Sequence, residues 1–427
     1  MKMHNLGSTG VQVSEHCLGA MMFGKIGNPD HDDCIRIIHR ALDAGVNFID
    51  TADVYSQGES EEIVGKAIAG RRDDVVLATK VHAPMGRDPN MWGNSRRWIQ
   101  REVENSLRRL GTDWIDLYQV HRPDEAADVD DTLGALSDLV HQGKIRYAGS
   151  STVPAEYIVE AQWVAERRGR ERFRCEQPPY SILVRDVERS VLPTCQRYGM
   201  GVIPWSPLAG GYLAGRYRKG AELPPDSRMA RRFGGQFEDE RQRAVHEQRV
   251  DVVEELLKVT ADAGITITHL AMAFVLEHPA VTSAIIGPRT MEQLETQIGA
   301  ADVVLSDDVL DRIDEIAPPG RNINPADGGY TPPALSDPAL RRGERQLDTF
   351  RTSMFNRASL RNGPDAVLGS SMSNRGMLNE RTATACHGPD GAAAGHHRRH
   401  GLGGWHDGRR TRLQIRRGAV LRAGRDA

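Results

Sequence analysis

Residues Gly45–Gly65 read GVNFIDTADVYSQGESEEIVG, and this stretch says most about the fold of the chain. Asp50 ends a short apolar run, and Tyr55 follows it in the loop before an expected helix. Two later apolar runs also end near an ionisable residue, at Lys80 and at His121. Polar residues at the C-terminal ends of successive buried strands are typical of the active face of a barrel.

Short strand-like runs alternate with helix-like stretches over most of the chain, which favours an α/β protein with parallel strands. We expect eight strands, at Cys17–Met22, Asn47–Ala52, Val75–Val81, Ile115–His121, Ile145–Ser151, Cys175–Tyr180, Gly201–Ser206 and Thr282–Gly287. Amphipathic stretches lie between them, as in the helical spacing of Ile99, Val103, Leu107 and Leu110. Eight β/α units over roughly 300 residues predict a (β/α)8 TIM barrel.

A doubly wound sheet is the structural alternative. It would be expected to have a GxGxxG turn after its first strand, whereas Leu18–Gly24 reads LGAMMFG. The barrel is therefore preferred. Met85–Gly93 and Gly210–Arg243 are expected to be long loops at its C-terminal face. Ile323–Pro333 is expected either to wrap back over the barrel mouth or to hang free.

The chain of 427 residues divides into two parts of different composition. Arg341–Ala427 contains 17 Arg, no Lys and 7 acidic residues, so its net charge is +10 and that of the remainder is −13. We expect residues 1–335 to form the barrel and residues 336–427 to be a disordered tail, because so few apolar residues cannot offset the entropy of ordering. Arginine without lysine suggests the hypothesis that the tail is translated from a shifted or read-through frame of GC-rich DNA.

The composition favours a cytoplasmic protein without a nucleic-acid or membrane partner. The acidic body gives no reason to bind nucleic acid or an anionic membrane. No apolar run approaches the roughly 20 residues of a membrane span, and Met1–Gly10 lacks the order of a signal peptide. Cysteines occur at Cys17, Cys34, Cys175, Cys195 and Cys386. This odd number without CxxC spacing predicts buried free thiols rather than disulfides or a zinc site. The oligomeric state is not indicated.

Asp50, Tyr55, Lys80 and His121 form a set that suits protonation of a carbonyl oxygen. A tyrosine phenol has an ordinary pKa of about 10, and we expect the Lys80 ammonium to lower it and make Tyr55 a better acid. Asp50 would hold Lys80 by a charge-assisted hydrogen bond, and a neutral His121 would orient the carbonyl oxygen or relay a proton. Each residue alone also has a structural explanation, but four at neighbouring strand ends favour a site. The set suits protonation of a carbonyl while a hydride arrives at its carbon, and no nucleophile is required.

On these residues the chain resembles the aldo-keto reductases, over about Asn5–Leu335. Gly45–Gly65 is similar to the first signature of that family, and Asp50, Tyr55, Lys80 and His121 fall on its catalytic tetrad. The resemblance implies NADPH-dependent reduction of aldehydes or ketones, with Tyr55 as the general acid and without a metal. Potassium-channel β-subunits share this barrel and its Trp-Ser-Pro-Leu-Ala loop. A binding subunit that holds NADPH with little turnover is therefore the alternative.

The resemblance also implies which residues hold the cofactor. It assigns this role to Gly19, Ala20, Met21, Asp50, Ser151, Thr152, Gln177, Trp205, Ser206, Pro207, Leu208, Ala209, Gly210, Arg216, Arg228, Gly287, Arg289, Gln293 and Gln297. Thr152 stands where the family usually has Asn, and Trp205 takes the place of the aromatic residue that stacks on the nicotinamide. Arg289 lies in a strand-to-helix turn whose N–H groups suit an anion, and we expect it to grip a 2′-phosphate. Substrate contacts are expected from Phe23, Trp92 and Trp205.

Overall fold

The eight expected strands form one parallel sheet in the order β10-β3-β4-β5-β6-β7-β8-β9. They are β3 (His16–Gly19), β4 (Phe48–Asp50), β5 (Val76–Val81), β6 (Ile115–Val120), β7 (Ile145–Ser151), β8 (Phe173–Gln177), β9 (Gly201–Val202) and β10 (Ala284–Ile286). Backbone hydrogen bonds join β9 to β10, from Thr282 N–H to the Val202 carbonyl at 2.8 Å and from Ile285 N–H to the Pro204 carbonyl at 2.9 Å. The sheet thereby closes on itself, and the predicted (β/α)8 fold is confirmed.

The computed structural model describes residues 1–225, 227, 230, 237 and 239–342. Arg228 and most of the expected tail lie outside these residues. The disorder of the tail, its reading frame and the boundary after residue 335 therefore remain predictions.

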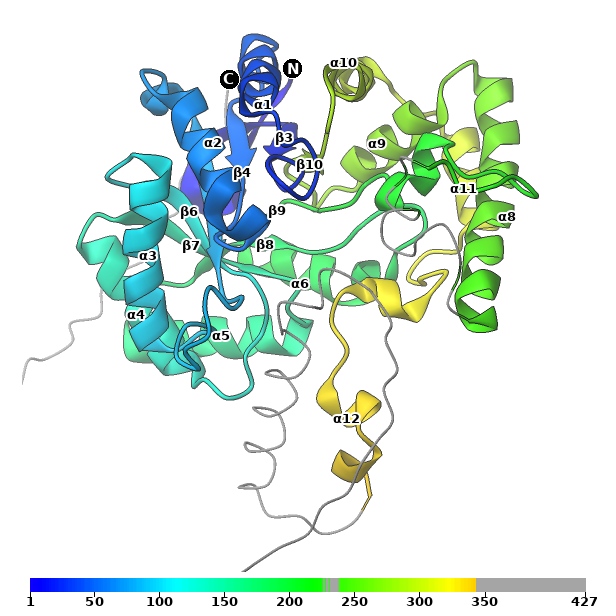
Figure 1. Cartoon of the computed structure of the whole chain (residues 1–427). Helices are drawn as coiled ribbons and strands as arrows, with labels where there is room; N and C mark the ends of the chain where they lie inside the picture. The colour runs from blue at the N-terminus through cyan, green and yellow to red at the C-terminus, as the bar shows by residue number, and fades with distance from the viewer. Residues whose placement is uncertain (226, 228–229, 231–236, 238, 343–427) are drawn as a thin grey trace, which may run out of the picture. The chain divides into compact units, whose positions relative to one another are not determined.

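The described part of the chain forms the following helices, most of which cover the outside of the strands. They are α1 (His31–Asp43), α2 (Glu59–Ile68), α3 (Arg96–Leu110), α4 (Val129–His141), α5 (Ala155–Arg168), α6 (Val191–Tyr198), α8 (Glu240–Ala263), α9 (Ile267–Glu277), α10 (Met291–Ile298), α11 (Asp307–Ile316) and α12 (Pro333–Ser336). Figure 1 shows α2 to α5 outside the strands, with α8, α9 and α11 grouped together. In α3 the expected apolar face is buried, the Ser95 side chain accepts from Trp98 N–H, and Gly111 ends the helix with a φ of 63°. Sequence signals for a helix start and stop thus fix its length.

A hairpin that the sequence did not predict closes the N-terminal end of the barrel. Its strands β1 (Met3–Asn5) and β2 (Gln12–Ser14) are antiparallel. Leu6 and Val13 are fully buried and pack in the same cluster as Phe48 from the barrel interior. Two apolar side chains therefore seal the end of the barrel opposite the strand ends that carry the ionisable residues.

The segment Ile323–Pro333 wraps back over the barrel mouth, which is one of the two expected outcomes. Its first residue donates from its N–H to the Leu183 carbonyl at 3.0 Å, and Tyr330 Oη donates to Glu125 Oε1 at 2.7 Å. Gly329 has a φ of 76°, and a Cβ built on it would meet a Trp205 ring carbon at 3.0 Å. Only glycine fits there, because the backbone lies directly against the indole.

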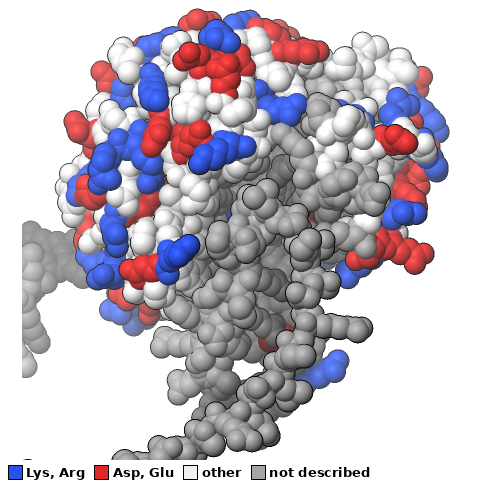
Figure 2. All heavy atoms as spheres, viewed as in Figure 1, with Lys and Arg blue, Asp and Glu red and all other residues white. Residues whose placement is uncertain are grey.

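The charged side chains on the surface and the state of the cysteines are as the composition predicts. Figure 2 shows Lys and Arg interspersed with Asp and Glu over the described part of this face. Cys17, Cys34, Cys175 and Cys195 are buried and free as predicted, whereas Cys386 lies outside the described residues. In the described part of the chain no single helix is long and apolar enough to cross a membrane, although α8 and α9, which meet at 92°, would suffice by length and composition if taken together.

Candidate active site

Lys80 lies fully buried beneath the floor of the barrel mouth, with three hydrogen-bond acceptors around its ammonium. Nζ lies 2.6 Å from Asp50 Oδ2, 2.8 Å from the Thr51 carbonyl oxygen and 3.2 Å from Tyr55 Oη. An ammonium has three protons to donate, so these partners satisfy it completely. The ends of β4 and β5 thus bring together three of the four residues predicted as a catalytic set.

A strained turn directs the phenol of Tyr55 toward Lys80. Ser56 and Gln57 both adopt left-handed backbone angles, with φ values of 51° and 59°. Each such residue costs about 1–3 kcal/mol, and this strain is tolerated mainly at functional sites. The ammonium of Lys80 also lies 4.9 Å from the centroid of the Tyr55 ring. The strained backbone of the turn after β4 therefore helps to hold the Tyr55 phenol against Lys80.

The protonation states of the set follow from burial and from its own charges. The Lys80 ammonium lowers the pKa of Tyr55 as expected, but burial has the larger effect, so the pKa is raised overall. Burial lowers the pKa of Lys80, but Asp50 and Tyr55 outweigh it and the pKa is raised. Burial, followed by Lys80 and Arg122, holds the pKa of His121 well below 6.5. The phenol is neutral, the lysine charged and the imidazole neutral.

His121 completes the predicted set from the end of β6. Its ring stands at 82° to the ring of Tyr55, with 5.8 Å between the centroids. Both side chains line the same cavity, and a neutral imidazole can donate from one ring nitrogen and accept at the other. A carbonyl oxygen placed between them could accept from the phenol and from the imidazole together.

Two amides fix the remaining oxygen of Asp50. Oδ1 accepts from Gln177 Nε2 at 2.9 Å and from Gln119 Nε2 at 3.2 Å. Gln119 was not predicted from the sequence. It precedes His121 by two residues on β6, and the alternation of strand side chains therefore puts both on the inner face. The carboxylate that holds Lys80 is itself held by amides from β6 and β8, two strands that are not adjacent in the sheet.

A cavity of about 890 Å³ opens from the mouth of the barrel. Seventeen of the predicted site residues line it, namely Gly19, Met21, Asp50, Tyr55, His121, Ser151, Gln177, Trp205, Ser206, Pro207, Leu208, Gly210, Arg216, Gly287, Arg289, Gln293 and Gln297. Four described residues do not line it: Lys80 lies beneath it, and Ala20, Thr152 and Ala209 face elsewhere. Arg228 lies outside the described residues.

The loop after β9 borders the middle of this cavity. Ser206 and Ala209 have left-handed φ values of 59° and 46°, and they are followed by Gly210 and Gly211 at 68° and 101°. No atom lies within 4 Å of a Cβ built on Gly210. The chain therefore turns sharply here and leaves open space beside its backbone, as a phosphate-binding loop requires.

The far end of the cavity lies at the start of α10. Thr290 caps this helix by accepting from Gln293 N–H at 3.3 Å, and Arg289 N–H donates to Gln293 Oε1 at 2.8 Å. Gln297 is buried on the next turn, and its Oε1 has no hydrogen-bond partner among the described residues. A buried amide oxygen without a donor is costly, and Gln297 lines the cavity, so a ligand bound there could supply the donor.

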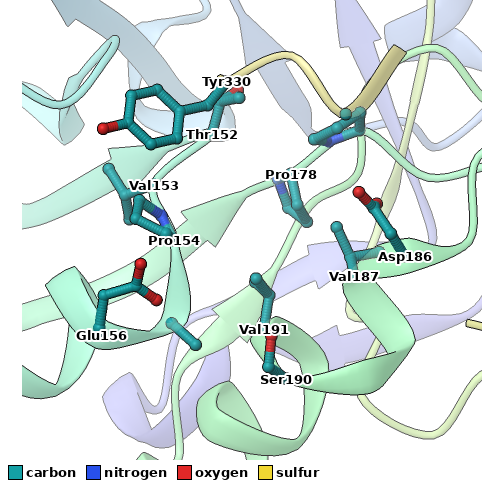
Figure 3. A pocket seen from close by; sticks show the side chains of 13 residues that line it. Thr152, Val153, Pro154, Glu156, Pro178, Asp186, Val187, Ser190, Val191 and Tyr330 are labelled. Atoms are coloured by element: carbon teal, nitrogen blue, oxygen red, sulfur yellow. The ribbon is translucent and has the colours of Figure 1, made fainter. Parts of the chain in front are cut away.

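Thr152 was predicted to bind the cofactor, but it lines a different pocket from the large cavity. Its Oγ1 accepts from Arg122 Nη1 and from Trp205 Nε1, both at 3.2 Å. It lines a separate pocket of about 170 Å³ (Figure 3), with Tyr330 beside it and Asp186 across the pocket. Since the hydroxyl is already engaged, Thr152 positions its neighbours and does not face the large cavity.

Two expected substrate contacts are not found. Phe23 is fully buried in the core, and Trp92 packs against His82 at 5.9 Å between ring centroids, so neither lines the cavity. Three further cavity residues, Ile286, Thr290 and Glu292, belong to the stretch 286–294, which resembles the adenosine-phosphate segment of the family. The sequence reasoning missed the cavity residues Met22, Arg122, Gly211, Ala214, Tyr217, Thr268, Met272, Ile285 and Thr296. Arg122 follows His121 directly, so its place at a strand end was the one available signal.

Comparison with known proteins agrees with this geometry. A profile described as the aldo/keto reductase family matches residues 16–318. A Bacillus subtilis protein named uncharacterized oxidoreductase YrpG is 39% identical over 343 residues, which is 78% of this chain and 98% of the relative. A probable voltage-gated potassium channel subunit beta from Oryza sativa subsp. japonica is 35% identical, over 74% of this chain and 96% of its own length. A norsolorinic acid reductase from Aspergillus flavus is 33% identical, over 73% of this chain and 79% of its own length. The chain belongs to the aldo/keto reductase family.

Proposed function

We propose that the protein is an NADPH-dependent oxidoreductase that reduces aldehydes or ketones to alcohols. The observation that carries this proposal is the contact of a buried ammonium, Lys80, with the hydroxyl of Tyr55 at 3.2 Å at one end of a large cavity. The names of the reductase relatives support the same reaction class.

The residues of the cavity fit a nicotinamide dinucleotide. The volume of about 890 Å³ is large enough, and the buried Gln297 Oε1 needs a donor such as the amino group of an adenine. Trp205, Ser151 and Gln177 would hold the nicotinamide end, and Ser206–Gly210 with Arg216 the pyrophosphate. Arg289, Gln293 and Gln297 would hold the adenosine end, with Arg289 on a 2′-phosphate. When bound, the reduced cofactor supplies a hydride to the carbonyl carbon.

The protein itself supplies the proton for the reaction and the charged groups that stabilise its donor. Tyr55 donates its phenolic proton to the carbonyl oxygen as negative charge develops there. The phenolate that remains is stabilised by the Lys80 ammonium, which Asp50 keeps charged and in place. His121 is neutral, so it can donate a second hydrogen bond to the same oxygen without adding a charge. Solvent entering the cavity then returns a proton to Tyr55.

Oxidation of NADPH in the presence of a panel of aldehydes and ketones tests the proposal. We expect turnover with at least some of these compounds and formation of one alcohol for each NADPH consumed. Tight binding of NADPH without turnover on any compound would contradict it.

A second candidate function is an NADPH-holding subunit with little turnover. The similarity to proteins named as probable potassium channel β-subunits favours it, because it covers 96% of two such relatives. Both candidates bind the cofactor in the same cavity. Turnover and the need for a protein partner separate them.

The remaining features of the proposal concern the chain as a whole. We place the protein in the cytoplasm, acting on a small carbonyl compound without a nucleic-acid or membrane partner. We also propose that residues 1–335 form the catalytic unit and that 336–427 is a disordered appendage. Limited proteolysis should leave a resistant core that ends near Leu340. A tail as resistant as the barrel would contradict this division.

A further inference from the structure

Arg122 presents unused hydrogen-bond donors to the catalytic end of the cavity. Its Nη1 donates to the His121 carbonyl at 2.6 Å and to Thr152 Oγ1 at 3.2 Å, which fixes the plane of the guanidinium. An arginine has five N–H protons, and those on Nε and Nη2 have no acceptor among the described residues. Neither nitrogen is sealed from solvent, and the side chain lines the cavity together with Tyr55 and His121.

Arg122 also lacks a counter-ion, unlike the comparable arginines of the barrel. Arg109 pairs with Glu61 and Glu102, Arg185 pairs with Glu188 and Asp314, and Arg249 pairs with Asp327. No described carboxylate forms an ion pair with Arg122. Arg122 is only partly exposed, and a partly buried guanidinium without an ion-pair partner is costly, so its position calls for a functional explanation.

Glu176 attracts Arg122 without forming an ion pair with it, and the acidic groups near Arg122 have other partners. Asp50 is occupied by Lys80 and by the amides of Gln119 and Gln177. Glu176 accepts from Ser150 Oγ and from Val153 N–H, and burial raises its pKa to about 7. The field at this end of the cavity is therefore positive, from Lys80 and from Arg122.

We propose that Arg122 binds a carboxylate of the substrate and makes carbonyl compounds that carry such a group the preferred substrates. This inference rests on the proposed function, because it assigns a substrate class to the same site. A guanidinium offers parallel N–H donors that match the two oxygens of a carboxylate. Tyr55 and His121 donate to the carbonyl oxygen that reacts, so Arg122 is left to bind the carboxylate of the same molecule.

Paired substrates measure this preference directly. We compare 4-carboxybenzaldehyde with its methyl ester, which has the same ring and the same aldehyde but no charge. The unmodified protein should favour the acid in kcat/KM by about tenfold to a hundredfold, the value of one charge-assisted hydrogen bond. In Arg122→Met the loss on the acid should exceed the loss on the ester by about the same factor and lie mainly in KM. Arg122→Lys keeps the charge but loses the paired N–H donors of the guanidinium. Its acid-to-ester ratio of kcat/KM should therefore lie between those of the unmodified protein and of Arg122→Met.

The control variant is Arg36→Met, since Arg36 is an exposed arginine on α1 whose one ion pair among the described residues is with Asp33. It should leave the acid-to-ester ratio unchanged. NADPH affinity, measured by fluorescence titration, should not differ between the Arg122 variants and the unmodified protein. Equal kcat/KM for acid and ester in the unmodified protein, or equal losses on both in Arg122→Met, would overturn the proposal. So would a loss of NADPH affinity that accounts for the whole effect.

A binding measurement separates this inference from the reaction itself. Calorimetric titration of the NADP-loaded protein with benzoate and with benzamide reports the carboxylate preference without turnover. If no aldehyde is reduced but benzoate binds more tightly than benzamide and Arg122→Met abolishes the difference, the reductase proposal fails and the anion site stands. If aldehydes are reduced and benzoate shows no preference, the reductase proposal stands and the anion site fails.

Discussion

Lys80 and Asp50 form an ion pair at 2.6 Å in which the two side chains are 0% and 3% exposed. The pair lies under the phenol of Tyr55 and fixes the ammonium that faces it. The buried pair therefore contributes both to the stability of the fold and to the protonation state of Tyr55.

Removing Lys80 should destabilise the fold as well as stop the reaction. In Lys80→Met the Asp50 carboxylate stays buried without its cation, and the free energy of unfolding should fall by about 3–5 kcal/mol. Urea denaturation measures this change. The matched control is Arg36→Met, which breaks an exposed pair with Asp33 and should cost at most about 1 kcal/mol. Equal losses in the two variants would show that the buried pair has no special role.

Glu176 should make stability depend on pH in an unusual direction. Burial raises its pKa from 4.5 to about 7, so between these values the folded protein holds a proton that the unfolded chain has lost. The contribution to stability is full below pH 4.5 and is lost as the pH rises toward 7. Glu176→Gln removes this dependence, and the difference between the two proteins should change by ~3 kcal/mol across the window. Parallel unfolding curves at both ends of the window would contradict the assignment.

The rate of carbonyl reduction should be flat across neutral pH. The raised pKa of Tyr55 keeps the donor protonated up to at least about pH 10, and the lowered pKa of His121 keeps the imidazole neutral down to below about pH 6.5. The limiting rate, kcat, should therefore fall only at alkaline pH as the phenol loses its proton. A fall in kcat that is centred near neutrality would mean that one of these two groups titrates in the working range.

Arg289 should distinguish NADPH from NADH. Arg289→Ala should raise the dissociation constant of NADPH by about tenfold to a hundredfold, because one charge-assisted contact to the 2′-phosphate is lost, and it should affect NADH much less. Arg216→Ala is the matched comparison, since a pyrophosphate contact is common to both cofactors and should weaken both alike. Fluorescence titration gives all four constants. Equal weakening of NADPH and NADH by Arg289→Ala would remove the 2′-phosphate role.

The strands and the positions of three tetrad residues at strand ends were predictable because each depends on local sequence. Apolar runs gave all eight strands, and Asp50, Lys80 and His121 stand near the ends of runs where parallel strands must converge. The hairpin β1–β2 was not predicted, because strands of three residues with mostly exposed side chains have no periodic signal.

What the sequence could not predict is set by packing around the site. The pKa of Tyr55 rises because burial outweighs the charge of Lys80, and burial is a property of the folded barrel rather than of the motif. Thr152 is engaged by Arg122 and Trp205, which are remote from one another in the chain. The same holds for Gln119, whose amide meets Asp50 only across the closed sheet.

The most direct test of the account is single-turnover reduction of an aldehyde by Tyr55→Phe together with its affinity for NADPH. Loss of the phenolic hydroxyl removes the proton donor next to Lys80 while the cavity walls stay in place. We predict a rate lower by at least about a hundredfold, with an NADPH dissociation constant close to that of the unmodified protein. A variant that reduces the aldehyde at the original rate would contradict the claim that this hydroxyl protonates the carbonyl oxygen.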